Sequence, residues 1–358
     1  MFQTAAPARV AAEEQFRPMK IVLVTDAWLP QVNGVVRTWQ RVTAACEAEG
    51  HRVTVISPAD FRTVPLPTYS EIRIALWPGP KVRRMLDAAQ PDAVHIATEG
   101  PLGLAARAHC LKRGWPFTTS YHTKFPEYVS ARFPVPESWG YRVVSWFHRP
   151  SSAVLVATPT VRRELEAEGF TNIADWTRGV DTALFRPDGP RAFVHDGPIL
   201  LYAGRVAVEK NLRAFLDLDL PGRKVVVGGG PQLDELRRDY PDVVFPGPKF
   251  GEELAAWYRS ASVFVFPSRT DTFGLVLLEA LASGVPVAAY PVPGPLDVVG
   301  HDGPGCLDDD LGRAVRAAMA VSAQDCRAHA MRFSWERTAA MFLGNLAPIR
   351  GDRTWMKA

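Results

Sequence analysis

Short apolar runs alternate, along the first half of the chain, with longer segments in which apolar residues recur every three or four positions. The first run, Lys20-Ile-Val-Leu-Val-Thr-Asp26, ends in a polar pair and precedes a glycine-containing loop and a helical pattern over residues 35–49. Further short runs occupy residues 53–56, 72–76, 93–96, 117–120 and 153–157. This alternation predicts parallel strands joined by crossover helices, that is, a doubly wound α/β sheet.

The same alternation starts again near residue 198. Its apolar runs occupy residues 198–203, 224–227, 243–245, 262–266 and 285–289. Between the two series, residues 178–190 are rich in proline and glycine, which indicates a linker or hinge near residues 180–197. We therefore expect two Rossmann-like domains, over residues 19–180 and 181–333, facing a cleft at the carboxyl ends of their strands, where such sheets bind ligands.

Composition narrows the class of protein. Of the 358 residues, 47% are hydrophobic and 22% are charged, which is ordinary globular usage, and the net charge of +3 is too small for a dedicated nucleic-acid binder. The four cysteines are scattered, residues 1–18 hold no apolar run of signal-peptide length, and no stretch reaches 18 apolar residues. We expect a cytoplasmic protein, with attachment to a membrane surface left open.

The strongest motif extends from Phe266 to Pro286, where an apolar run leads into a polar loop and then a helical pattern. A helix that starts around residues 272–274 points free backbone N–H groups into the cleft, which makes an anion site. Asp271 and Glu279 are eight positions apart, a little over two helical turns, so both carboxylates can face one ligand. The alternative makes Asp271 an N-cap and Glu279 a satisfied core carboxylate, and spacing alone leaves both open.

A second motif places Arg205 after a strand and Lys210 at the start of the next helix. A bidentate guanidinium and a mobile ammonium suit a diphosphate, although a solvated helix face has the same pattern. The glycine run at residues 228–230 follows another strand and lets backbone approach a ligand. It lacks the full dinucleotide fingerprint, and no Gly-Lys-Ser/Thr phosphate loop exists, which disfavours nicotinamide and P-loop chemistry.

Two further residues lie at strand ends of the first half. Gly34 follows the first strand and can let a phosphate approach the N-terminus of the next helix, with a plain turn as the alternative. His122 follows the run that ends at residue 120, on the expected cleft side. A lone histidine is more often structural, so this residue alone does not decide between function and packing.

Taken together, these segments, from Met19 to about Leu346, resemble the retaining nucleotide-sugar glycosyltransferases of family four, which have the two-domain GT-B fold. The resemblance implies that Asp271 contacts the donor sugar, in place of the commoner glutamate, and that Glu279 contacts the ribose. His122 would contact the sugar. The diphosphate would be held by cations, backbone N–H groups and a close glycine, at Arg205, Lys210, Thr272, Phe273, Gly274, Leu275 and Gly34.

The resemblance extends to two more segments. Lys249, in Pro246-Gly-Pro-Lys249, lies where relatives place the nucleobase, and Ser334-Trp-Glu336 resembles the start of a C-terminal helix, within residues 334–358, that crosses back to the first domain. Arg205 and Lys210 would stabilise the leaving group, whose phosphate accepts the acceptor's proton. No metal or cofactor is expected, because the acidic runs at residues 217–219 and 308–310 do not end a buried apolar strand.

The form of residues 271–280 and 289–297 looks most like the branch that uses GDP-mannose and makes α-mannosides. The nearest competing branch attaches UDP-linked sulfoquinovose or glucuronic acid to diacylglycerol. A nucleotide-sugar epimerase or a catalytically silent sugar-nucleotide binding protein would also fit these residues. We expect a lipid or glycan acceptor and no nucleic acid.

A segment rich in basic and aromatic residues, 105–150, indicates what kind of acceptor the protein uses. Residues 105–150 hold seven cations, two anions and ten aromatic residues; the first half has a net charge of +5 and the second half −2. Cations beside amphipathic aromatics suit an anionic membrane, so we expect peripheral contact with the inner membrane through Lys124, Arg132, Arg142 and Arg149. The alternative places the aromatics in the core and the cations in water.

Overall fold

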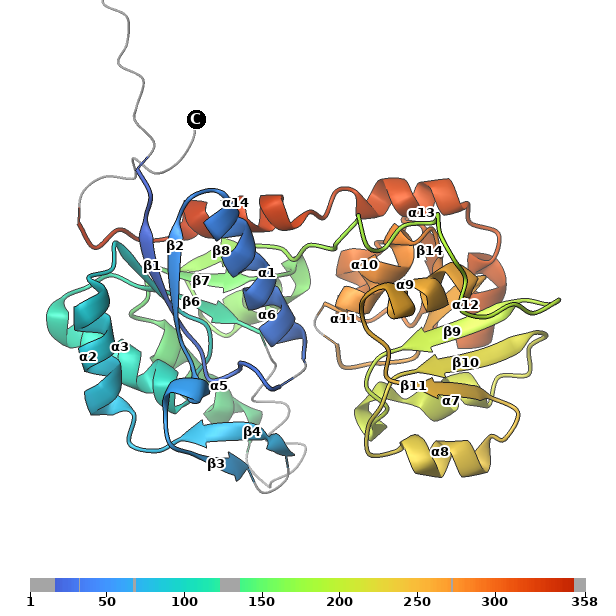
Figure 1. The fold of residues 1–358 in the computed structure, drawn as a ribbon, viewed down its shortest axis with the longest axis horizontal. Helices are drawn as coiled ribbons and strands as arrows, with labels where there is room; N and C mark the ends of the chain where they lie inside the picture. The colour runs from blue at the N-terminus through green and yellow to red at the C-terminus, as the bar shows by residue number, and fades with distance from the viewer. Residues whose placement is uncertain (1–16, 32, 67–68, 123–135, 272, 351–358) are drawn as a thin grey trace, which may run out of the picture.

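The computed structural model describes residues 17–31, 33–66, 69–122, 136–271 and 273–350, and it contains two six-stranded sheets side by side (Figure 1). The first sheet has the order β2-β1-β5-β6-β7-β8, and all its strand pairs are parallel. Its strands are β1 (Lys20–Val24), β2 (Arg52–Ile56), β5 (Ala93–Ile96), β6 (Thr118–Tyr121), β7 (Ala153–Val156) and β8 (Ile173–Asp175). The predicted doubly wound α/β architecture is confirmed here.

The second sheet is also parallel throughout and has the order β11-β10-β9-β12-β13-β14. Counted from its own first strand, this is the Rossmann order 3-2-1-4-5-6. Its strands are β9 (Ile199–Ala203), β10 (Arg223–Val227), β11 (Val244–Gly247), β12 (Val263–Phe266), β13 (Val287–Ala289) and β14 (Gly305–Leu307). In both sheets the strand order reverses beside the first strand, β1 or β9, which is where ligands bind.

Helices cover both faces of each sheet (Figure 1). In the first half they are α1 (Gly34–Ala48), α2 (Gly79–Ala89), α3 (Pro101–Arg113), α5 (Glu137–His148) and α6 (Pro159–Ala167). In the second half they are α7 (Leu212–Leu216), α8 (Leu233–Asp239), α9 (Gly251–Ser260), α10 (Leu275–Ala282), α11 (Pro293–Val298), α12 (Leu311–Ala318), α13 (Ala323–Ala330) and α14 (Trp335–Asn345). One 3-10 turn, Pro58–Asp60, lies in the first half, and another, Val208–Lys210, lies in the second. Because alternate residues of β1 enter different cores, the strand reads as one continuous apolar run.

Three edge elements differ from the predicted pattern. The run at residues 72–76 was expected in the parallel sheet, but it belongs to β4 (Tyr69–Ala75), which pairs antiparallel with β3 (Thr63–Leu66) in a separate two-stranded sheet. The edge strands β8 and β14 were not predicted. Each has only three residues, none fully buried, so neither produces a strong apolar run.

The helix α14 crosses from the second half to the first (Figure 1). Its residues Phe342 and Leu343 join the core that contains Trp39 of α1. The connecting residues 176–198 form no helix or strand, as the proline and glycine content predicted. Phe185 of this segment packs in the core of the second half, and the Arg327 side chain donates hydrogen bonds to its carbonyl and to that of Thr182. The exact domain boundaries stay a prediction.

Candidate active site

The loops that carry the predicted site residues follow central strands of the two sheets. Gly34 begins α1 after β1, and His122 directly follows β6. In the second half, Arg205 follows β9 and Asp271 follows β12. β1, β9 and β12 flank the points where the strand order reverses, and β6 lies one strand further along the first sheet, so the loops after these strands lie at the carboxyl edges of the two sheets, where ligands bind.

A close ion pair lies at this boundary on the side of the second half. The Lys210 Nζ is 2.6 and 2.8 Å from the two carboxylate oxygens of Asp271, and both side chains are about one-fifth exposed. The Tyr202 hydroxyl donates to the Arg205 carbonyl over 2.8 Å and so fixes the loop that leads to Lys210. The Asp271 carbonyl accepts a hydrogen bond from the Gly294 N–H. Asp271 is therefore held in place by its backbone and by its carboxylate.

Among the described residues, no side chain caps the N-terminus of α10. Gly274 is its N-cap residue, with a left-handed φ of 81° that favours glycine, so the alternative in which Asp271 caps this helix is wrong. A methyl group placed on Gly34 would lie 3.9 Å from Leu275 Cδ1, so the first residue of α1 faces the first residue of α10. Thr272, also predicted here, lies outside the described residues. The unfilled N–H groups at this point suit an anion.

Glu279 lies within α10 and has partners from both halves. The Tyr258 hydroxyl donates to one oxygen over 2.9 Å, and the Arg37 guanidinium of α1 lies 3.4 Å from the other. Burial raises the pKa of Glu279, while Arg37 and Tyr258 oppose the rise. The prediction that Asp271 and Glu279 face one ligand stays a prediction, because each carboxylate here has its own cation.

His122 is buried and lies beside Trp39 of α1. The Trp39 indole N–H donates to His122 Nε2 over 2.9 Å, so in the neutral ring the proton is on Nδ1. An Arg178 nitrogen lies 3.4 Å from that Nδ1. Burial, and then the Arg178 charge, hold the pKa of His122 well below 6.5. The side chain is therefore a neutral hydrogen-bonding group at physiological pH.

Three residues of this boundary were not predicted: Arg37, Trp39 and Arg178. Both Arg37 and Trp39 lie within the predicted helical segment, and the position of Arg37 three residues after Gly34, about one helical turn, is a signal that could have identified it; Trp39, five residues after Gly34, gave no such signal. Arg178 was assigned only to the start of the linker. Its position in the site depends on how the two halves pack.

The remaining predicted donor residues lie further out. Arg205 is exposed, as is Phe250 beside Lys249. Lys249 is 3.8 Å from Glu253, one helical turn onward. Their assignment to the diphosphate and the nucleobase remains a prediction from the resemblance.

The glycine run at residues 228–230 was expected to lie against a ligand, but two of its glycines lie against the backbone of the loop that carries Arg205. A Cβ on Gly228 would lie 1.8 Å from the Gly204 carbonyl oxygen, and one on Gly230 would lie 2.3 Å from that of Val206. These glycines therefore let two backbone loops pack together, and the run positions the loop of Arg205 from behind.

The acidic runs stay outside the site. Asp217 accepts from the Tyr240 hydroxyl, Asp308 pairs with Arg313, and Asp310 caps α12. Asp308 follows the edge strand β14, whose three residues are only partly buried, so this acidic run does not end a buried apolar strand. Within the described part of the chain, no group of three or more histidine, cysteine or acidic side chains could hold a metal ion.

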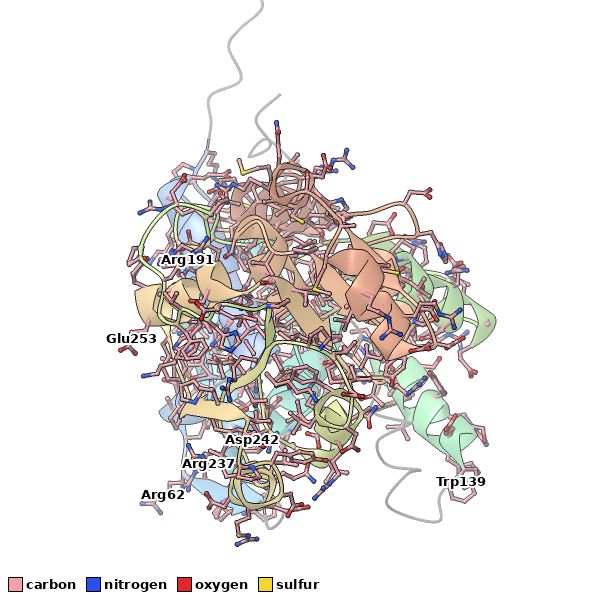
Figure 2. The ribbon with its side chains drawn as sticks, turned by 90° about the vertical axis from the view of Figure 1, so that its right-hand side faces the viewer. Arg62, Trp139, Arg191, Arg237, Asp242 and Glu253 are labelled. Atoms are coloured by element: carbon pink, nitrogen blue, oxygen red, sulfur yellow. The ribbon has the colours of Figure 1, made fainter. Side chains whose placement is uncertain are left out.

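The basic, aromatic segment divides between core and surface. Phe117, Tyr121 and Phe147 are buried, as the alternative predicted, but Trp139 and Trp146 of α5 are 63% and 54% exposed. Trp139 lies at the outer end of α5, which extends away from the body of the protein (Figure 2). Arg142 and Arg149 are exposed on the same helix and just after it. Lys124 and Arg132 lie outside the described residues.

Comparison with known proteins agrees with this organisation. A family model described as Glycosyltransferase Family 4 matches residues 32–184, and one described as Glycosyl transferases group 1 matches residues 197–323. The chain is 31% identical to a GDP-mannose-dependent alpha-mannosyltransferase of Mycobacterium tuberculosis, over 95% of this chain and 99% of that protein.

Two other relatives differ in the activity their names state. Sulfoquinovosyl transferase SQD2 of Arabidopsis thaliana is 28% identical, over 82% of this chain and 64% of that protein. A GDP-mannose-dependent alpha-(1-6)-phosphatidylinositol dimannoside mannosyltransferase of Mycobacterium tuberculosis is 26% identical, over 92% and 97%.

Solved structures share the fold. Sucrose-phosphate synthase from Thermosynechococcus elongatus aligns with a TM-score of 0.71 over 90% of this chain and 96% of that one, at 22% identity. The family of the chain follows from three findings. Each half matches a glycosyltransferase family model, and one relative is 31% identical along almost its whole length. The chain belongs to glycosyltransferase family 4, has the GT-B fold, and is a glycosyltransferase.

Proposed function

We propose that this glycosyltransferase moves mannose from GDP-mannose to a hydroxyl group of a lipid or glycan, with retention of the anomeric configuration. Two of the relatives are named as GDP-mannose-dependent, which supports this donor over a UDP-linked sugar. Membership of a transferase family argues against the epimerase and the silent binding protein that the sequence left open.

One observation carries the proposal: Lys210 holds Asp271 beside the uncapped N-terminus of α10, opposite Gly34. A diphosphate needs positive charge and free N–H donors, and both are present there. The sugar attached to it needs a fixed hydroxyl acceptor, which Asp271 supplies. His122, kept neutral, adds a hydrogen bond without a second charge.

The reaction breaks the bond between the sugar C1 and the phosphate oxygen, and it forms a bond from C1 to the acceptor oxygen on the same face. The electron pair of the broken bond leaves with the diphosphate. The acceptor's proton goes to the departing phosphate. The protein's main contribution is electrostatic, because Arg205, Lys210 and the α10 N-terminus stabilise the charge that develops on the leaving group.

Substitution of two residues tests this assignment. Lys210→Ala should lower turnover about 100-fold through loss of charge stabilisation. Glu279→Ala should lower kcat/KM about 10- to 100-fold through loss of a charged hydrogen bond to the donor ribose. The assay is transfer of labelled mannose from GDP-mannose to a lipid extract. Lys112→Ala, at an exposed lysine near the end of α3, is the matched control and should have no effect.

The site assignment and the donor assignment can fail independently, and different results would show each failure. Near-normal rates in both variants would overturn the site assignment. Thermal shift of the wild type with GDP and with UDP identifies the nucleotide, and stabilisation by UDP alone would overturn the proposed donor.

The acceptor proposal rests on α5. Trp139, Val143 and Trp146 are all more than half exposed and are spaced four and three positions apart, so they share one face of the helix. Arg142 and Arg149 flank this face. Such a helix lies in a membrane interface with its tryptophans among the lipids and its cations at the headgroups. We propose that α5 holds the enzyme on the inner membrane, where a lipid acceptor is present.

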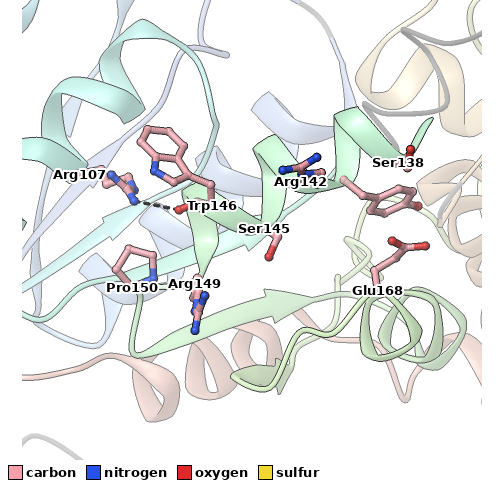
Figure 3. Close-up of a pocket in the computed structure, with 9 residues that line it drawn as sticks. Arg107, Ser138, Arg142, Ser145, Trp146, Arg149, Pro150 and Glu168 are labelled. Carbon is pink, nitrogen blue, oxygen red and sulfur yellow. Dashed lines mark hydrogen bonds between the residues drawn. The ribbon is translucent and has the colours of Figure 1, made fainter. Parts of the chain in front are cut away.

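The surroundings of α5 suit an anionic headgroup. A shallow cavity of about 760 Å³ runs along the helix and is lined by the side chains of Arg142 and Arg149 (Figure 3). Arg107 lies 4.0 Å from the Trp146 ring centroid and donates to the Trp146 carbonyl, so it holds this tryptophan in place. In the part of the chain that the structure describes, no helix is long and apolar enough to cross a membrane.

Vesicle co-sedimentation tests the membrane proposal. The double variant Arg142→Gln/Arg149→Gln should bind phosphatidylcholine vesicles that contain phosphatidylglycerol about 30-fold more weakly, at about 1 kcal/mol per cation. The control Arg191→Gln/Arg238→Gln removes the same charge from exposed positions of the second half and should bind normally. Equal binding of the wild type to neutral and anionic vesicles, unaffected by the α5 substitutions, would overturn the proposal.

A further inference from the structure

Arg178 lies on the segment that connects the two halves, and its backbone is fixed from both sides. The Trp176 indole donates to the Thr338 carbonyl of α14, and the Val180 N–H donates to the Phe333 carbonyl. A Cβ on the intervening Gly179 would lie 2.6 Å from the Trp335 nitrogen, so the chain passes in direct contact with the start of α14. The Arg178 side chain is therefore held in one place at the boundary.

The Arg178 guanidinium is buried among groups that do not neutralise it. The residue is 5% exposed, and its carbon Cζ lies 5.3 Å from the Phe273 ring centroid. Its Nη1 lies 3.6 Å from where a Cβ of Gly34 would be, and its Nη2 lies 3.4 Å from His122 Nδ1. Among the described residues, no carboxylate is within ion-pair distance of it, and the buried Nε has no hydrogen-bond partner.

This arrangement is unfavourable for an unliganded protein. A buried charge costs several kcal/mol unless it is paired, and a guanidinium has five N–H donors to satisfy. The structure offers at most one acceptor among the described residues, His122 Nδ1, and this atom carries the proton in the neutral ring. Burial lowers the pKa of Arg178 to about 10, with Asp271 opposing the shift, so the side chain remains a cation at neutral pH. An anion from outside the chain would satisfy it.

The neighbours of Arg178 identify which anion. Gly34 begins α1 and Phe273 precedes the uncapped N-terminus of α10, so the guanidinium lies where the two helix starts face each other. Asp271, the proposed sugar ligand, is the carboxylate whose charge acts most on Arg178. We propose that Arg178 is a further catalytic residue, which binds the sugar-linked phosphate of the donor diphosphate through its guanidinium; this rests on the proposed function.

In this role Arg178 transfers no proton. It donates hydrogen bonds to the phosphate oxygens while the sugar C1–oxygen bond breaks and the electron pair moves onto the phosphate. Because the site is closed to water on the side of Arg178, the charge acts on the phosphate with little screening. The planar guanidinium lies over the ring of Phe273. A lysine ammonium is not planar and does not reproduce this contact.

Binding of free nucleotides separates this role from a structural one. Arg178→Met keeps the apolar stem and removes the charge. It should weaken binding of GDP about 10- to 100-fold in calorimetric titration, the loss of a charged hydrogen bond. Binding of GMP, which lacks the second phosphate, should change less than twofold. The melting temperature without nucleotide should be equal or higher, because an unpaired buried charge has been removed.

Every other outcome counts against the proposal. Equal losses for GDP and GMP, an unchanged GDP affinity with a raised acceptor KM, or a lower melting temperature or unfolding of Arg178→Met would overturn it. Arg178→Lys provides a second check and should have a GDP affinity between those of the wild type and Arg178→Met. Repeating the titrations with UDP and UMP keeps the test valid if the donor is a UDP-sugar. Binding of neither diphosphate by the wild type would overturn both this proposal and the proposed function.

Discussion

At the scale of single residues, the boundary between the halves is organised by charge. Lys210 pairs with Asp271 within the second half, Arg37 reaches Glu279 across the boundary, and Arg178 has no carboxylate in reach among the described residues. The sequence motifs contained Lys210, Asp271 and Glu279 as candidates, but they did not contain the two arginines in these roles. Arg37 and Glu279 are 242 positions apart, so no local pattern could have paired them.

Two buried histidines near this boundary make stability depend on pH. Burial lowers the pKa of His95 to about 3 and holds that of His122 well below 6.5, with His148 and Arg178 adding to the effect. The unfolded chain binds protons at these sites below about pH 6.5 and the folded protein does not, so stability is lost as pH falls. We expect the free energy of unfolding to drop by about 3 kcal/mol between pH 7.5 and 5.5.

Urea unfolding at the two pH values measures this drop. The variant His122→Gln should remove about half of it. His301→Asn, at an exposed histidine, is the control and should leave the dependence unchanged. An equal free energy of unfolding at both pH values would contradict the prediction.

At the scale of elements, central strands were predicted well and edges were not. Strands such as β1 and β12 are buried on both faces, so their residues are apolar, apart from the exposed Lys20 at the start of β1, and the run is visible in the sequence. The three-residue edge strands β8 and β14 are not buried on both faces, so their residues need not be apolar. The apolar run in β4 correctly predicts a strand, but the run alone does not say which strand it pairs with. Its antiparallel pairing with β3 is decided by the tertiary structure.

The glycine run gives a prediction about one loop. Gly228→Ala should destabilise the protein by more than about 2 kcal/mol, because its Cβ would collide with the Gly204 carbonyl and its φ of 147° disfavours a side chain. The displaced loop carries Arg205, so transferase activity should fall as well. Chemical denaturation and the transfer assay measure the two effects.

The adjacent glycine is the matched control. A Cβ on Gly229 would have as its nearest neighbour Pro248 at 3.8 Å, an ordinary contact. Gly229→Ala should therefore change stability by less than about 1 kcal/mol. Equal effects at the two positions would show that the close packing of the loops is unimportant.

At the scale of the whole molecule, α14 joins the halves by completing the core of the first. Phe342 is 2% exposed, and its ring lies 5.3 Å from that of Trp39 and 5.1 Å from that of His95. Phe342→Ala should lower the free energy of unfolding by about 3–5 kcal/mol. Because Phe342 packs against Trp39, and Trp39 orients His122, transferase activity should also be lower at temperatures where the variant is still folded.

Arg337→Ala, at an exposed position of the same helix, is the comparison and should be near neutral. The measurements are thermal unfolding and mannose transfer at a temperature where both variants are folded. A small effect of Phe342→Ala on stability would mean that α14 is not part of the first core.

The sequence by itself determined the class of fold, the restart of the pattern near residue 198, and the residue types after each central strand. These follow from local rules, because a strand buried on both faces must be apolar and a ligand loop must follow it. The tertiary structure alone decided that Trp39 orients His122, that Arg37 reaches Glu279, and that Arg178 is enclosed without a carboxylate partner among the described residues. Those contacts join segments far apart in the chain, and only the packing of the two halves brings them together.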